Sequence, residues 1–170
     1  SSSFPPLSSG RVSKTNDDDM HRCAIVLFGL PRAFSSLVLP SLERNVIPQN
    51  PHCDYFVHYY IQTTETAGRS GGGGRMDPHE ILALRQAVQN VHPPAVIQFV
   101  NDTEAQFWEQ YGNLTQTIRT ARDENGQPLY FPYKAQTYHS FTVTDNILKM
   151  WHSIQSAFGL MAAHEERNHM

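Results

Sequence analysis

The chain has 170 residues and a formal net charge of −3 at pH 7, a length that suits a single domain. Hydrophobic residues make up 39% and charged residues 17% of it, which excludes disorder along the whole chain. The sequence lacks the basic excess of nucleic-acid-binding proteins, and its longest apolar run, AIVLFGL, is far shorter than the roughly 20 residues that span a bilayer. We therefore expect one globular domain with no nucleic acid partner and no transmembrane segment.

The first 20 residues differ in composition from the rest of the chain. They are rich in Ser, Pro and Asp and contain too few large apolar side chains to form a core. We predict a disordered tail or stem over residues 1–20, followed by one domain over residues 22–170. Because the chain starts with Ser1 and its last helix lacks a stop signal, we interpret it as a fragment. A location in the Golgi lumen would follow if the tail continued from a membrane anchor.

Strand and helix signals alternate along the domain. Three segments have the apolar, β-branched or aromatic composition of buried strands, at residues 22–28, 54–60 and 95–100. Helical signals follow them at residues 35–47, 78–91, 103–111 and 144–167. Such alternation is typical of βαβ units. The sequence therefore predicts an α/β fold with an open, mainly parallel, Rossmann-like sheet and flanking helices.

The last helix, over residues 144–167, has the most regular pattern. Large apolar side chains recur along it every three or four residues, at Ile147, Trp151, Ile154, Phe158 and Met161. Such spacing places them in an apolar stripe on one side of a helix.

Two segments lack a regular pattern. Residues 62–75 include four consecutive glycines and predict a mobile surface loop. Residues 112–141 give no firm element, apart from a turn predicted by the letters NGQP at 125–128.

The two cysteines, Cys23 and Cys53, begin neighbouring strands of the predicted sheet. We expect them to lie near each other. A disulfide is less favoured than proximity, because it needs Cα atoms within about 7 Å and suitable Cβ directions.

The loop FGLPRAF, at residues 28–34, follows the first strand and opens a helix. Ligands of open parallel sheets bind at the carboxyl ends of strands, where backbone N–H groups and a helix N-terminus attract anions. Arg32 adds a guanidinium group that suits phosphate. The Walker A and GxGxxG patterns are absent from the sequence, which argues against ATPase and dehydrogenase functions. The simpler alternative is a turn made by Gly29 and Pro31, with Arg32 in solvent.

Four segments carry a resemblance to a known group of proteins. FGLPRAF, LPSLERNV, CDYFVHYY and NILKMWHSIQSAFGLM resemble the amino-terminal half of eukaryotic glycosyltransferase-like proteins with a nucleotide-diphospho-sugar transferase (GT-A-like) fold. The resemblance spans residues 22 to about 163. It implies an incomplete GT-A-like domain that uses a nucleotide sugar as donor substrate and transfers the sugar to an unknown acceptor.

The resemblance also implies roles for individual residues. Gly29 and Arg32 fall at the nucleotide or diphosphate, and His58 falls at the ligand edge of the sheet as a substrate-binding candidate. The full set of predicted nucleotide-binding residues is Gly29, Pro31, Arg32 and Asp102. The implied helix-packing positions are Trp151, Ser153 and Ile154. We assign no catalytic residue.

A metal-dependent sugar transferase needs carboxylates spaced D-x-D at a strand end, where they hold a divalent ion against a diphosphate. Within this chain, the run Asp17 to Asp19 lies in the predicted tail. Asp102 and Glu104 are better explained as helix caps, and Asp102 alternatively contacts a ribose or base. The nine histidines form neither HxH nor HExxH. We therefore predict no metal ligand within this chain. The resemblance implies that a transferase of this kind could use Mn²⁺ or Mg²⁺, with the acidic ligands on a strand that follows Met170.

Two other functions stay open. A strand followed by G-x-P-R and two serines imitates the 5′-phosphosulfate loop of sulfotransferases, although the bulky Phe34 would obstruct close approach to phosphate. The second alternative is that the chain is a non-catalytic α/β interaction module. Acyl transfer has no support, because the Gly-x-Ser-x-Gly pattern is absent from the sequence.

Overall fold

The computed structural model describes residues 23–65, 73–130 and 142–168. Its main sheet has three parallel strands, and their order is β1-β2-β5. The strands are β1 (Cys23–Gly29), β2 (Cys53–Tyr60) and β5 (Ile97–Asp102). The predicted α/β class and parallel sheet are confirmed. The tail predicted over residues 1–20 lies outside the described residues.

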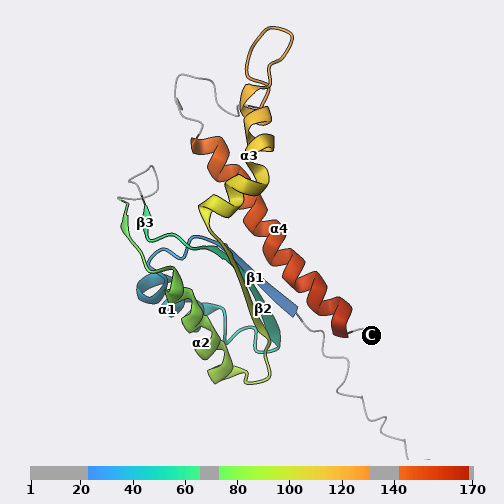
Figure 1. Ribbon diagram of the computed structural model, residues 1–170. Helices are drawn as coiled ribbons and strands as arrows, with labels where there is room; N and C mark the ends of the chain where they lie inside the picture. Colours follow the sequence, from blue (N-terminus) through green and yellow to red (C-terminus); the bar gives the residue numbers. More distant parts are fainter. Residues whose placement is uncertain (1–22, 66–72, 131–141, 169–170) are drawn as a thin grey trace, which may run out of the picture.

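Helices cover both faces of this sheet (Figure 1). One face carries η2 (Phe34–Val38), α1 (Leu39–Asn45), η3 (Pro78–Leu82) and α2 (Ala83–Val91). The long helix α4 (Thr142–Asn168) crosses the other face, and α3 (Glu104–Thr120) continues from the carboxyl end of β5. The result is a sheet between two helical layers, which is consistent with a Rossmann-like arrangement.

The central strand β2 is buried along its whole length and contributes to both cores. Successive side chains of a strand point to opposite faces. Tyr55, Val57 and Tyr59 accordingly join an apolar cluster with Ile81 and Leu84 beneath α1 and α2. The alternate residues of β2 lie beneath α4, and these include Phe56, His58 and Tyr60. The second core is therefore aromatic and polar rather than aliphatic.

The helix starts follow the local sequence. Asp77 caps η3 by accepting a hydrogen bond from the N–H of His79 at 2.9 Å. The helix predicted over 78–91 therefore begins as a 3₁₀ turn before α2. A capping box of Thr103 and Gln106 starts α3, which runs past its predicted end at residue 111.

The helix predicted over 35–47 is divided into η2, which has π-helical hydrogen bonding, and α1. Ala33 precedes it with a φ of 45°. Pro40 is the second residue of α1, directly after η2. Proline has no N–H to donate to the preceding helical turn. Pro40 therefore lies at the junction of the two helical segments.

The apolar stripe of α4 is only partly buried: Ile147, Ile154 and Met161 are half-buried. Trp151 is 60% exposed and Phe158 is 48% exposed, whereas Ser153 and Ala157 are fully buried. Small side chains let the helix lie close to the sheet, and the hydroxyl of Ser153 finds polar partners there. The implied packing role of Trp151 is corrected for the same reason.

Cys23 and Cys53 are aligned in register at the start of β1 and β2 and form a disulfide. Their Cα atoms are 4.4 Å apart, within the range that a disulfide requires. The predicted proximity is confirmed. The bond, which was the less favoured outcome, is present because parallel register brings the two residues face to face.

The two irregular segments are partly described. At the ends of the predicted loop over residues 62–75, β3 (Thr64–Glu65) and β4 (Gly74–Arg75) pair in an antiparallel ladder. Residues 66–72 lie outside the described residues. At the predicted turn, Gly126 has a φ of 75° between the bridged residues Arg122 and Pro128.

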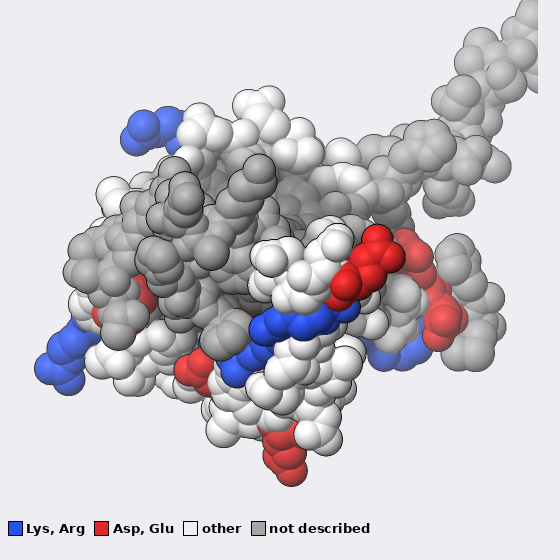
Figure 2. Space-filling view, turned by 90° about the horizontal axis from the view of Figure 1, so that it is seen from above, with Lys and Arg blue, Asp and Glu red and all other residues white. Residues whose placement is uncertain are grey.

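On the face seen in Figure 2, basic and acidic side chains lie beside one another. Among the helices that the structure describes, none has both the length and the hydropathy needed to cross a membrane.

Tyr55 has a buried hydroxyl group with no hydrogen-bond partner in the described structure, and burial raises its pKa. An unpaired buried polar group costs about 1 kcal/mol or more. We expect Tyr55→Phe to raise the free energy of unfolding by about 1 kcal/mol in urea denaturation. Tyr59→Phe is the matched control, because the Tyr59 hydroxyl accepts a hydrogen bond from Asn101 at 3.4 Å. Equal effects of both substitutions would contradict this explanation.

Candidate functional site

A cavity of about 750 Å³ opens at the carboxyl ends of β1 and β2. Its lining residues are Phe28, Gly29, Leu30, Arg32, Tyr60, Gln62, Thr64, Glu65, Glu104, Asn146, Lys149, Met150 and Ser153. Small-molecule sites typically have volumes of about 300 to 1,000 Å³. In open parallel sheets they lie outside the carboxyl ends of the strands. The position and size of this cavity therefore suit a small-molecule ligand.

The cavity wall carries two ion pairs. Arg32 pairs with Glu65, and Lys149 pairs with Glu104. The hydrogen bond from Lys149 lowers the pKa of Glu104. The Arg32 side chain is 45% exposed. Exposed ion pairs stabilise a fold by only about 0 to 1 kcal/mol, so a charged ligand can replace either partner at little cost.

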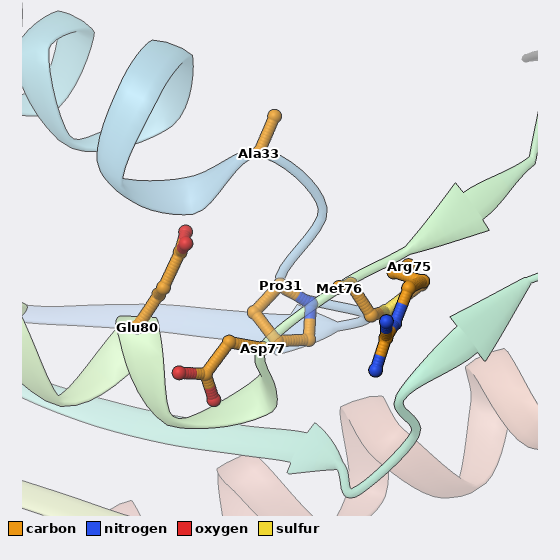
Figure 3. Close-up of a pocket in the computed structure, with 6 residues that line it drawn as sticks. All are labelled: Pro31, Ala33, Arg75, Met76, Asp77 and Glu80. Carbon is orange, nitrogen blue, oxygen red and sulfur yellow. The ribbon is translucent and has the colours of Figure 1, made fainter.

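A smaller cavity of about 400 Å³ lies at the same loop, and Pro31 lines it rather than the larger cavity. In Figure 3, Glu80 extends from its helix toward the helix that follows Ala33. Its carboxylate accepts a hydrogen bond from the N–H of Ser35 at 3.0 Å. The helix N-terminus at which the sequence predicts an anion therefore already holds a carboxylate of the chain itself.

The predicted site residues are only partly brought together. Gly29 and Arg32 line the larger cavity, whereas Pro31 lines the smaller one. Asp102 and His58 line neither cavity. His58 is fully buried, and its ring contacts Ser153 and Asp102.

A hydrogen-bond network lies beneath α4. The N–H of Gly29 donates to Ser153 Oγ at 3.1 Å, and Ser153 Oγ lies 2.5 Å from His58 Nδ1. On the other side of the ring, His58 Nε2 lies 3.1 Å from Asp102 Oδ2. His152 Nε2 lies 2.7 Å from the same oxygen. All contacts of His58 are satisfied when its ring is neutral and carries the proton on Nε2.

The electrostatics of the network agree with this assignment. Burial lowers the pKa of His58 and outweighs the opposing effect of Asp102. Burial alone would raise the pKa of Asp102, but the hydrogen bonds from His152 and His58 outweigh it and lower that pKa. The network therefore combines a neutral imidazole with an ionised carboxylate at pH 7.

Aromatic rings surround the His152 side of the network. The ring of His152 lies 5.0 Å from that of Tyr111 and 5.7 Å from that of Phe107, between ring centroids. His152 is not among the site residues predicted from the sequence. The one sequence signal for it is that His152 and Ser153 place two adjacent polar residues within the apolar pattern of the last helix.

The D-x-E pair after β5 does not form a Mn²⁺ or Mg²⁺ site. The carboxylate of Asp102 faces the two histidines, whereas that of Glu104 binds Lys149 and the indole N–H of Trp108. These hard cations need several oxygen ligands arranged around one point. The two carboxylates do not converge on a shared position.

Comparisons with known proteins found no match to this chain. No family model, curated protein or solved structure matched it. No family is therefore assigned.

Proposed function

We propose that this chain binds a nucleotide sugar in the larger cavity, as part of a glycosyltransferase-like protein that transfers the sugar to an acceptor. The supporting observation is the set of charges in that cavity: Arg32 and Lys149 stand beside Glu65 and Glu104 over the ends of neighbouring parallel strands. Arg and Lys bind phosphate through charge-assisted hydrogen bonds. Carboxylates accept hydrogen bonds from hydroxyl groups. A nucleotide sugar presents both kinds of group.

In this proposal the diphosphate replaces the two carboxylates as partner of Arg32 and Lys149. Glu65 and Glu104 are then free to accept hydrogen bonds from ribose or sugar hydroxyls. The exposed ring of Phe28 offers an apolar surface to the base at the cavity wall. Gly29 has a φ of 113° and nothing within 4 Å of the position that a Cβ would occupy, so a ligand can approach the backbone there.

Arg32→Ala should weaken binding of a nucleoside diphosphate sugar by roughly 10- to 150-fold, or about 1.5 to 3 kcal/mol, because a charge-assisted contact is lost. Arg32→Lys should restore part of it, since an ammonium group lacks the bidentate fork. Calorimetry with UDP- and GDP-hexoses measures the affinity. The melting temperature should stay nearly unchanged, because the pair with Glu65 is exposed.

Glu65→Gln should have the opposite sign and strengthen binding, because it removes the charge that competes with phosphate for Arg32, while the amide oxygen can still accept a hydrogen bond from a ligand hydroxyl. Arg75→Ala is the matched control, since Arg75 lines only the smaller cavity. An effect of Arg75→Ala without one of Arg32→Ala would move the ligand to the smaller cavity and overturn the proposal.

Two ligand controls separate the alternatives. Tighter binding of 3′-phosphoadenosine 5′-phosphosulfate than of any nucleotide sugar would favour the sulfotransferase-type function. Absence of binding to both ligand classes would favour a non-catalytic interaction module. Either result would overturn the proposed function.

A further inference from the structure

Three side chains that could bind a metal converge beneath α4. His58 comes from β2, Asp102 from the end of β5 and His152 from α4. One ligand atom from each lies within 4.8 Å of the other two. Both histidines direct Nε2 at the same carboxylate oxygen, at 3.1 and 2.7 Å. The three elements that form the second core therefore meet at one cluster of donor atoms.

The distances and the donor types suit zinc. Metal bonds of about 2.0 to 2.1 Å at tetrahedral angles place neighbouring ligand atoms about 3.3 Å apart. The observed separations of 3.1 and 2.7 Å are shorter than this value by about 0.2 and 0.6 Å. All three ligand atoms lie within 4.8 Å of one another, so small side-chain shifts are needed for them to bind one ion. Two imidazoles and one carboxylate favour Zn²⁺ or Co²⁺, whereas Mg²⁺ and Ca²⁺ prefer oxygen ligands alone.

The surroundings resemble the outer shell of a metal site. A metal-bound histidine usually donates its second ring N–H to a fixed acceptor. Ser153 Oγ lies 2.5 Å from His58 Nδ1 and could accept that hydrogen bond once Nε2 binds metal. The aromatic rings of Phe107 and Tyr111 pack beside His152. The Asp102 side chain is 26% exposed, which provides a route for an ion to enter.

We propose that His58, Asp102 and His152 bind one Zn²⁺ ion, which links α4 to β2 and β5 and leaves a fourth coordination position to water. None of the three residues lines the larger cavity, so the inference goes beyond the proposed function and is independent of it.

The test is a titration of the EDTA-treated full chain with ZnCl₂, without any nucleotide. We expect one tight site per chain, a higher melting temperature, and the visible absorption of tetrahedral cobalt when CoCl₂ is used. An excess of Mg²⁺ should not displace the ion. Arg32→Ala should leave Zn²⁺ affinity unchanged, so failure of this inference and failure of the proposed function can be told apart.

Asp102→Asn and His152→Ala should each weaken Zn²⁺ binding by at least about 100-fold. Loss of an outer-shell partner already costs about 10- to 100-fold, and these two residues bind the ion directly. His164→Ala is the matched control, because His164 lies on the same helix and also faces an aspartate, Asp54, at 3.6 Å. If His152→Ala does not fold, Asp102→Asn and the cobalt spectrum of the unaltered chain decide. Absence of binding, or equal affinity in Asp102→Asn and His164→Ala, would overturn the proposal.

Discussion

Removal of the disulfide between Cys23 and Cys53 should lower the free energy of unfolding by about 3 to 4 kcal/mol. The bond joins residues that are 30 positions apart, so its loss increases the conformational entropy of the unfolded chain. Alanine at both positions is the preferred replacement, because Cys53 is buried and serine would place a hydroxyl group there. Urea denaturation of the oxidised chain, the reduced chain and the double alanine variant measures the effect.

The reduced chain and the double alanine variant should agree with each other. Ligand binding below the unfolding transition should change little, because the disulfide lies at the amino-terminal end of β1 and the cavity at the other end. Alkylation followed by mass measurement provides a separate check. Two free thiols in the native, unreduced protein would show that the bond does not form in solution.

Ser153→Ala should lower the free energy of unfolding by about 2 to 4 kcal/mol. The substitution leaves two groups without a partner, the N–H of Gly29 and Nδ1 of the fully buried His58. Each unpaired buried polar group costs about 1 to 3 kcal/mol. The effect should therefore exceed the cost of removing a single hydroxyl group from the surface of a helix.

Ser156→Ala is the matched control on the same helix, since Ser156 is only half-buried and makes no hydrogen bond in the described structure. It should change the free energy of unfolding by about 0.5 kcal/mol or less. In a double-mutant cycle with His58→Leu, Ser153→Ala should cost less than it does alone, by about 0.5 to 3 kcal/mol. Equal costs of Ser153→Ala and Ser156→Ala would contradict the role given to the network.

Local sequence determined the class of fold and the starts of several helices. Strand composition and helix spacing alternate along the chain, and that order is sufficient to predict a parallel sheet with flanking helices. Asp77 caps η3, and Thr103, rather than Asp102, caps α3. Each cap involves only residues two or three positions away, so the local sequence is sufficient to form it. Aligned strand starts were also sufficient to predict that Cys23 and Cys53 lie close together.

Tertiary structure alone decided how the elements meet. Ser153 and Ala157 of α4 are fully buried, whereas Trp151 and Phe158 of its apolar stripe are exposed, because the helix lies over the polar and aromatic face of β2. Helical periodicity identifies an apolar side of a helix but says nothing of which side a neighbouring sheet can accommodate. Arg32 likewise pairs with Glu65 of β3, although its side chain remains 45% exposed. The pair depends on where β3 lies relative to the loop after β1, which the local sequence does not determine.

The same reason explains why the cluster of His58, Asp102 and His152 could not be predicted. His58 and Asp102 are 44 positions apart in the sequence, and Asp102 and His152 are 50 positions apart. No local motif links such residues, since metal-binding patterns in sequence depend on ligands close together on one element. Their convergence follows from the parallel register of β2 with β5 and from the position of α4 across both strands. Packing of distant elements, rather than local propensity, brought these donor atoms together.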